Sequence, residues 1–203
     1  MYSIPNDIFF EIFRHFELKE LVKMELLNKQ IRKLIRTTKW TDIMVDLSKN
    51  KFIHFDYVLD NYQFIKFNLS FTKIIDLRKL KNCHTLNLYG CNKITDESVK
   101  ELKNCHTLNL SWCDKITDES VKELKNCHTL DLSNCDKITD ASVKEIKNCH
   151  TLNLSWCNKI TDESVKELKN CHTLNLSWCN KITDESVKEL KIVENFIFIV
   201  VIK

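Results

Sequence analysis

Glycine and proline are almost missing from this chain of 203 residues, which contains one of each. Gly-rich linkers, Pro-rich spacers and turns built on these two residues are therefore excluded as the main way of joining its elements. Long hydrophobic runs are missing as well. The longest, residues 196–202, has seven residues, whereas a helix that spans a bilayer needs roughly 20.

An excess of charge of one sign is also absent. The chain has 31 Lys and Arg against 28 Asp and Glu, giving a net charge of +3 with no basic block. This balance predicts neither nucleic acid nor a membrane surface as a partner. The first residues lack a positively charged leader before an apolar stretch. We therefore expect a protein of a reducing compartment, cytoplasmic or nuclear, and not a secreted one.

The chain is rich in repetition. Residues 148–169 and 170–191 are identical, and all ten cysteines recur with a 22-residue period. They form a first series (Cys83, Cys105, Cys127, Cys149, Cys171) and a second series (Cys91, Cys113, Cys135, Cys157, Cys179). Self-similarity at this period is typical of a solenoid, in which each repeat buries its apolar face against its neighbours.

Each repeat has two halves with different periods. Residues 105–116 alternate apolar and polar positions, as a short strand with one buried face does. Thr117 is suited to be the N-cap of a helix, and the acid Asp118 suits its first turn. Asp118 and Lys122 stand at i and i+4, where they are expected to pair. One strand and about two turns of helix are predicted for each repeat.

The pattern resembles the leucine-rich repeat, and more closely its cysteine-containing subfamily, over residues 83–191. In this chain cysteine replaces the first leucine of the motif, and the 22-residue period is short for the subfamily. The resemblance implies an α/β solenoid with parallel strands on a concave face and short helices on a convex face. We place this solenoid at 42–203, with clean repeats at 82–191, degenerate repeats at 42–81 and a terminal strand in 192–203.

Weaker copies of the strand pattern set the ends of this array. Val45-x-Leu47 and Phe67-x-Leu69 are separated by one full period, and the same step from Leu174 reaches Phe196-x-Phe198. About eight stacked strands are therefore expected.

The cysteines raise the question of a metal site, a disulfide framework or a plain core. Both positions point inward in a leucine-rich repeat, where a thiol acts as a small hydrophobe. The adjacent histidine, such as His106, is expected to face the opposite way, and no C-x-x-C or H-x-x-x-H spacing is present. We favour the core over a metal or a disulfide, although strands about 4.8 Å apart would permit oxidation in vitro. No catalytic residue, metal or cofactor is predicted.

The first forty residues have helical periods instead. Apolar residues mark three successive faces: Ile8, Ile12 and Phe16; Leu21, Met24 and Leu27; and Ile31, Leu34 and Ile35. Three short amphipathic helices in 1–41 are predicted.

This segment resembles the F-box in the order of its anchors: Ile4-Pro5, Ile8, Ile12, Leu21, Leu26-Leu27 and a closing Trp40. Asn28 and Ile31 depart from the residues common in that family. The resemblance implies docking on the Skp-type subunit of a cullin-RING ubiquitin ligase. The implied docking residues are Ile4, Pro5, Ile8, Ile12, Leu21 and Val22. The alternative is a helical cap on the first repeat.

Strand positions that alternate with the buried leucines form uniform columns on the expected concave face. The internal copies differ mainly at a few of these positions, and three tryptophans stand at the strand ends. The predicted substrate-binding residues are Tyr89, Trp112, Asp131, Asn134, Trp156 and Trp178. Trp156 and Trp178 could anchor a peptide or could pack on each other.

The leading interpretation is a substrate-recognition adaptor of an SCF-type ubiquitin ligase, whose repeats bind a protein substrate. A non-catalytic repeat scaffold with no ligase linkage is the alternative. A thiol or metal-handling protein is the least favoured interpretation.

Overall fold

A computed structural model describes residues 11–13, 15–27, 29–48, 55–191 and 198–200. The chain forms two compact units, an N-terminal unit, Met1–Asn68, and a repeat unit, Leu69–Lys203. The sequence pattern predicts a boundary after residue 41. The two units divide after Asn68, so residues 42–68 lie in the same unit as the preceding helices, and the boundary after residue 41 stays a prediction. Among the described helices, none combines the length and apolar character needed to cross a membrane.

The N-terminal unit consists of helices and two parallel strands. Its elements are α2 (Leu18–Met24), α3 (Lys29–Thr37), β1 (Lys39–Asp46), α4 (Phe55–Asn61) and β2 (Gln63–Asn68). Val45 lies opposite Phe67 in the β1–β2 pair, which confirms the predicted 22-residue offset. Of the three predicted helices, the first falls mostly outside the described residues. Trp40, expected to close the helical module, is a fully buried residue of β1.

Specific polar contacts hold this unit together. The Glu25 carboxylate is 3% exposed and accepts two hydrogen bonds from the Arg36 guanidinium, each 2.9 Å long. Arg32 donates to the Glu25 carbonyl from Nε and Nη2 at 3.3 and 3.2 Å. The indole Nε1 of Trp40 donates to the Ile35 carbonyl at 2.9 Å. These bonds fasten α3 to the end of α2 and to β1, since each spans two elements.

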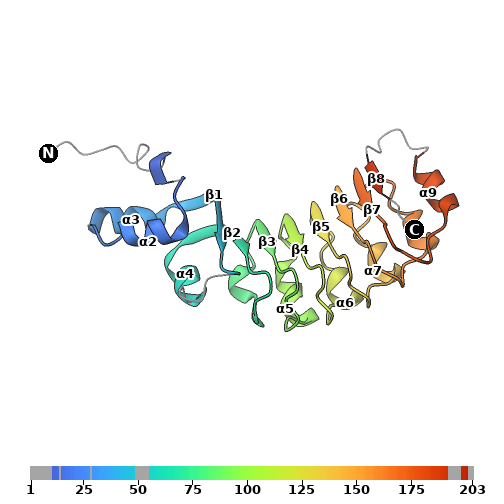
Figure 1. Cartoon of the computed structure of the whole chain (residues 1–203), viewed down its shortest axis with the longest axis horizontal. Helices are drawn as coiled ribbons and strands as arrows, with labels where there is room; N and C mark the ends of the chain where they lie inside the picture. The colour runs from blue at the N-terminus through green and yellow to red at the C-terminus, as the bar shows by residue number, and fades with distance from the viewer. Residues whose placement is uncertain (1–10, 14, 28, 49–54, 192–197, 201–203) are drawn as a thin grey trace. The chain divides into compact units, whose positions relative to one another are not determined.

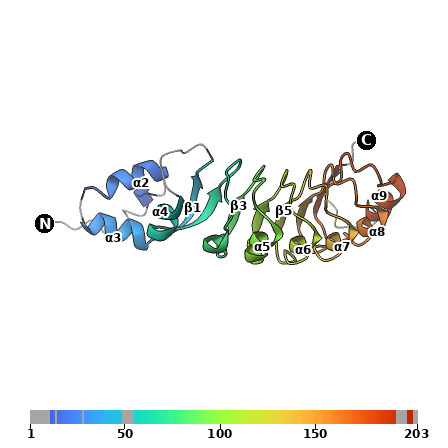
Figure 2. The same ribbon diagram turned by 90° about the horizontal axis from the view of Figure 1, so that it is seen from below.

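In the repeat unit, parallel strands follow one another in sequence order on one side, with the helices on the other (Figures 1 and 2). The strands are β3 (Thr85–Asn87), β4 (Thr107–Asn109), β5 (Thr129–Asp131), β6 (Thr151–Asn153), β7 (Thr173–Asn175) and β8 (Phe198–Val200). From β3 to β7 the register keeps the predicted 22-residue step, so Leu86 lies opposite Leu108. Together with β1 and β2, eight strands occur in the part of the chain that is described, as expected.

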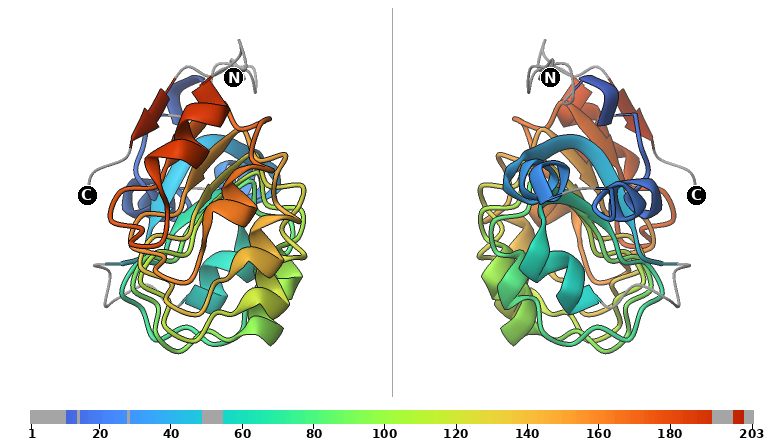
Figure 3. Two further views of the ribbon diagram at one scale, coloured as in Figure 1. Left: turned by 90° about the vertical axis from the view of Figure 1, so that its right-hand side faces the viewer. Right: turned by 90° about the vertical axis from the view of Figure 1, so that its left-hand side faces the viewer.

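The helices are shorter than predicted. A 3-10 turn, η1 (Arg78–Leu80), precedes α5 (Asp96–Val99) with η2 (Lys100–Leu102), α6 (Asp118–Val121), α7 (Asp140–Val143), α8 (Asp162–Val165) and α9 (Asp184–Lys191). The four-residue helices α5 to α8 are single turns and lie together on one side of the coil (Figure 3). A 22-residue repeat leaves few residues for the helix after its strand and two connections. The eight-residue α9 has the predicted two turns, and α5 approaches them by continuing into η2.

The last strand departs from the predicted spacing. Leu174 of β7 lies opposite Ile199 of β8, so the offset is longer than the repeat period, whereas the sequence pattern matches Leu174 to Phe196. The longer α9 precedes this strand, and it lengthens the connection between β7 and β8. Phe196 itself lies outside the described residues.

The cysteines belong to the core. All ten are buried free thiols, which confirms the inward orientation predicted for both series. In the second series each thiol donates to a leucine carbonyl of a preceding repeat, as from Cys113 to Leu88 at 3.3 Å and from Cys157 to Leu132 at 3.2 Å. Most of these carbonyls also accept a backbone amide of their own turn, as Leu88 does from Cys91 at 3.0 Å, so the thiol adds a bond from the next repeat. The second series therefore joins the turns that follow successive strands.

Burial also keeps these thiols in the neutral form. It raises the pKa of Cys135 and Cys149 to about 12 and that of Cys179 to about 11. The thiolate is the form that acts as a nucleophile or metal ligand. At neutral pH the cysteines are thus poorly suited to either role.

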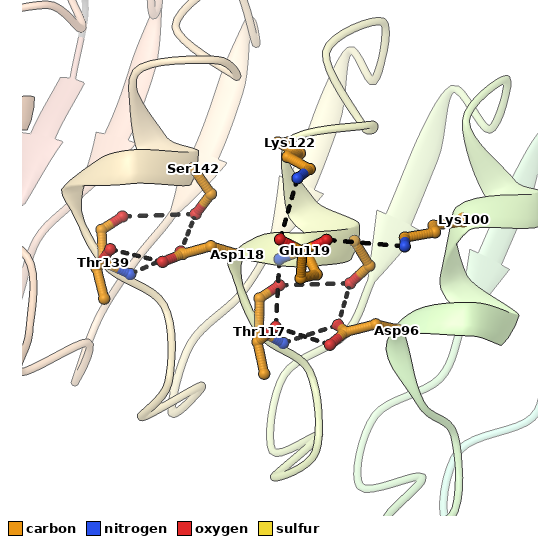
Figure 4. Close-up of polar contacts among 9 residues, drawn as sticks. Asp96, Lys100, Thr117, Asp118, Glu119, Lys122, Thr139 and Ser142 are labelled. Atoms are coloured by element: carbon orange, nitrogen blue, oxygen red, sulfur yellow. Dashed lines mark hydrogen bonds and ion pairs between the residues drawn. The ribbon is translucent and has the colours of Figure 1, made fainter.

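A second contact joins the helical sides of neighbouring repeats (Figure 4). Asp118 accepts hydrogen bonds from the Thr139 amide at 2.9 Å, the Thr139 hydroxyl at 2.6 Å and the Ser142 hydroxyl at 2.6 Å. We call this contact the Asp–Thr bridge. It recurs between Asp96 and Thr117, Asp140 and Thr161, and Asp162 and Thr183.

The bridge changes the role predicted for Asp118. Lys122 pairs with Glu119 at 3.1 Å instead, because the Asp118 carboxylate faces the next repeat. The predicted N-cap is confirmed, since Thr117 Oγ1 accepts from the Glu119 amide at 3.2 Å. The same hydroxyl donates to Asp96 at 2.7 Å, so one threonine both caps its helix and binds the preceding repeat.

Candidate interaction surface

Each strand of the regular array is followed by a tight turn whose second residue has a positive φ. These residues are Gly90 (67°), Trp112 (60°), Asn134 (59°), Trp156 (65°) and Trp178 (62°), and Phe71 (59°) occupies the corresponding place before them. We call this set the turn column. The left-handed backbone costs an ordinary residue roughly 1–2 kcal/mol, whereas Gly and Asn adopt it readily.

Gly90 and Asn134 are residue types that adopt a positive φ readily. The structure gives a second reason for a glycine at position 90. A Cβ atom at Gly90 would lie 2.8 Å from the ring of Phe71, which covers it. The same ring meets Tyr89 edge-on, with centroids 4.8 Å apart. Tyr89 and Gly90, which stand out as variable positions in the sequence, therefore differ from the other copies because they pack against Phe71.

Packing of the tryptophan side chains offsets little of the free-energy cost of this backbone. Trp112, Trp156 and Trp178 are 52%, 44% and 40% exposed. The Trp156 and Trp178 rings stack on each other with centroids 5.0 Å apart and planes at 18°. Three large aromatic side chains thus combine an unfavourable backbone with exposure to solvent.

The structure places the predicted binding residues in two different settings. Asp131 lies on β5, whereas Tyr89, Asn134 and the tryptophans lie in the turns beyond the strands. Asp131 accepts hydrogen bonds from the Ser133 amide and hydroxyl at 2.9 and 2.7 Å, as Asn109 does from Ser111. Both serines are buried, so they belong to the turn structure and not to an exposed face. Of the predicted binding residues, the tryptophans of the turn column are the most open to a partner.

The residues predicted to dock the N-terminal unit are also divided. Ile4, Pro5 and Ile8 lie outside the described residues. Ile12 is 45% exposed and Val22 is partly exposed, but Leu21 is fully buried inside the unit. Leu21 therefore packs in the interior of the N-terminal unit and is not part of its exposed surface.

Two exposed leucines were not predicted as docking residues. Leu26 and Leu27, which follow α2, are 78% and 63% exposed. In the sequence they serve only as anchors of the resemblance. With Ile12 they are the most exposed large apolar residues described before residue 40. The sequence has two adjacent leucines here, and only one of them fits the helical period. The sequence alone therefore could not show that both are exposed.

Comparisons with known proteins agree with the repeat geometry. The Leucine Rich repeat family model matches residues 106–125, 128–147, 150–169 and 172–191. No F-box domain is detected. No curated protein sequence matches the chain significantly.

Solved structures share the fold at low sequence identity. A chain of the yeast Rad7–Elc1 complex has a TM-score of 0.62 and 18% identity, over 85% of this chain and 53% of that one. The Listeria monocytogenes internalin InlF has a TM-score of 0.58 and 16% identity, over 91% and 56%. Internalin C2 of the same bacterium has a TM-score of 0.58 and 18% identity, over 90% and 91%. This chain thus spans about half the length of the first two. Its residues 106–191 are leucine-rich repeats, a fold typical of protein-interaction scaffolds.

Proposed function

We propose that this protein is a bipartite adaptor: its N-terminal unit docks on a Skp-type subunit of a cullin-RING ubiquitin ligase, and its repeat unit holds a protein substrate. The adaptor acts by placing the substrate near the ligase and performs no chemistry itself. The expected setting is the cytoplasm or nucleus.

The observation that carries the substrate half is the turn column. Trp112, Trp156 and Trp178 combine a left-handed backbone with high exposure. Exposed aromatic residues supply most of the binding energy in many interfaces, because they bury a large area and lose little side-chain entropy. The stacked pair Trp156–Trp178 offers a rigid edge against which an apolar side chain of a substrate can pack.

The docking half is supported by exposed apolar residues before residue 40. Leu26 and Leu27 leave large apolar side chains in solvent at the end of α2, where burial against a partner would be favourable. The buried Glu25–Arg36 pair holds the chain rigidly beside them. The match to a chain of the Rad7–Elc1 complex adds an example of this repeat fold assembled with a second protein.

Affinity purification of the full chain, followed by mass spectrometry, tests both halves. The wild-type protein should recover Skp-type and cullin subunits together with a substrate. The double variant Leu26→Asp/Leu27→Asp should lose the ligase subunits and keep the substrate. The double variant Trp156→Ala/Trp178→Ala should do the reverse. Each variant serves as the matched control for the other, because both change exposed side chains.

A scaffold without ligase linkage is the second candidate, favoured by the absence of a detected F-box domain. It predicts that the wild-type chain recovers repeat-dependent partners, lost with Trp156→Ala/Trp178→Ala, but no Skp-type or cullin subunit. That result would replace the ligase half of the proposal.

A further inference from the structure

Five histidines form a column that neither proposed binding surface uses. His84, His106, His128, His150 and His172 stand immediately after the first-series cysteines. Their rings stack with centroids 4.6, 4.6, 4.5 and 4.5 Å apart along the series. The planes of neighbouring rings differ by 10–26°. The first four side chains are exposed and that of His172 is partly exposed. We call this set the imidazole column.

The backbone fixes the spacing of the column. The His84 carbonyl accepts from the amides of His106 and Thr107 at 3.1 and 2.9 Å. The His106 carbonyl does the same for His128 and Thr129, at 2.9 and 3.0 Å. The amides of His106 and His128 each donate a hydrogen bond to the carbonyl of the preceding histidine. The backbone therefore places these rings side by side without any ligand.

Each of the first three rings has a threonine hydroxyl at its Nδ1 atom. The Nδ1–Oγ1 distances are 3.2 Å for His84–Thr85, 3.3 Å for His106–Thr107 and 3.4 Å for His128–Thr129. With Nδ1–H donating to the hydroxyl, Nε2 is the nitrogen that carries the free lone pair. A hydrogen bond of this kind orients histidines that bind metal ions through the other ring nitrogen.

We propose that neighbouring rings of the imidazole column bind divalent transition-metal ions, of the class Ni²⁺, Cu²⁺ or Zn²⁺, through paired Nε2 atoms. Imidazole is a preferred ligand for these ions, and water completes their coordination. With metal–nitrogen bonds of about 2.0–2.1 Å, two nitrogens of a tetrahedral ion lie roughly 3.3 Å apart. In the stack the ring centroids lie 4.5–4.6 Å apart and the planes are nearly parallel, so two neighbouring rings must tilt toward each other to direct both Nε2 lone pairs at one ion. The exposure of the side chains leaves room for this rotation. Each Nε2 serves one ion, so five rings hold at most two.

The other potential ligands of the repeat do not compete for these ions. The first-series thiols are buried, and that of Cys105 is directed at the carbonyls of His84 and Thr107.

The column allows a test in which two variants keep the same number of histidines. His106→Gln/His150→Gln leaves three rings with no adjacent pair, whereas His84→Gln/His172→Gln leaves three adjacent rings. Ni²⁺ is titrated calorimetrically into the reduced full chain at pH 7.5. Because a second ligand acts at high effective concentration, removing every pair should weaken binding by roughly 100-fold. The matched variant should keep nearly wild-type affinity, with one ion bound.

Equal affinity of the two variants, or no binding by the wild-type chain, would overturn the proposal. Circular dichroism of both variants checks that the array stays folded. A repeat of the wild-type titration at pH 5.5 should show weaker binding, because protonated imidazole cannot ligate a metal. Binding that is unchanged at pH 5.5 would also count against the column as the site. The test is independent of the adaptor proposal.

Discussion

The repeat unit joins its turns by the same contacts at successive junctions, whereas the N-terminal unit uses each of its contacts once. The Asp–Thr bridge occurs at four junctions, from Asp96–Thr117 to Asp162–Thr183. The Glu25–Arg36 pair and the Trp40–Ile35 bond have no second copy among the described residues. Losing one bridge should therefore weaken one junction of the array. Losing one of the single contacts should loosen the whole helical part of the N-terminal unit.

The largest expected effect tests the contact used once. Glu25→Ala removes the carboxylate and with it both charged hydrogen bonds of the Arg36 guanidinium, which is 34% exposed and keeps its bond to the Tyr57 hydroxyl. Breaking such a pair should cost about 3 kcal/mol. Hydrogen exchange of the α3 amides should report this loss of stability. Asp42→Ala, which alters an exposed acid of β1, is the control and should change exchange little. Equal protection in both variants would contradict the importance given to Glu25.

A smaller effect is expected for one bridge of the array. Asp118→Ala deletes three hydrogen bonds and leaves the Thr139 amide without its acceptor. A loss of about 2 kcal/mol in the free energy of unfolding is expected, measured by urea denaturation. Asp114→Ala changes an exposed acid of the same repeat and should have almost no effect. If the two variants lose the same stability, the bridge is not a stabilising contact.

Acid should weaken the bridges made by Asp96, Asp140 and Asp162 together. Burial raises the pKa of Asp96, Asp140 and Asp162, but hydrogen bonds from the serine and threonine of the next repeat outweigh it and leave each pKa below its ordinary value. Since the folded pKa is lower than the unfolded value of about 3.9, these groups stabilise the fold above that pH. Their contribution disappears as the pH falls through the folded pKa.

Urea midpoints measured from pH 6 to pH 3 check this dependence. The wild-type midpoint should fall most steeply below about pH 4. Asp140→Asn should show a shallower fall, because one titrating carboxylate is gone. An identical slope in the variant would show that other groups control the acid sensitivity.

The smallest effect is expected in the turn column. Trp112→Asn places a residue suited to the left-handed backbone at an exposed site, as Asn134 already is. Stability should stay the same or rise by up to about 1 kcal/mol, because strain is relieved and little packing is lost. Trp156→Asn also loses the stack on Trp178, worth about 1 kcal/mol, and should be close to neutral. A loss at Trp112 above about 2 kcal/mol, the scale of a buried large apolar side chain, would show that this tryptophan is structural.

The same difference between repeated and single contacts explains what the sequence could predict. The register from β3 to β7, the buried cysteines and the Thr117 cap follow from a motif with a 22-residue period. The partner of Asp118 could not be predicted, because a period shows which positions are equivalent but not which equivalent side chains meet. The longer offset at β8 depends on a connection with no second copy among the described residues.

The candidate surface was predicted only in part. The tryptophans were identified as exposed aromatic residues, but their place in left-handed turns depends on backbone angles that the alternation of apolar residues does not encode. In the N-terminal unit, the pattern that made Leu21 a docking residue equally fits a core position, where the structure places it. The stacking of the histidines follows from the parallel register once the strands are known.

The architecture of the repeat unit depends most on cysteines that serve as core residues. A thiol titration of the reduced full chain with Ellman's reagent tests this directly. In the native protein, the ten thiols should react extremely slowly, because they are buried and their pKa values are raised. All ten should react at once in guanidinium chloride. Rapid reaction of the native thiols, at the rate of a free cysteine, would contradict the buried stack on which the repeat unit rests.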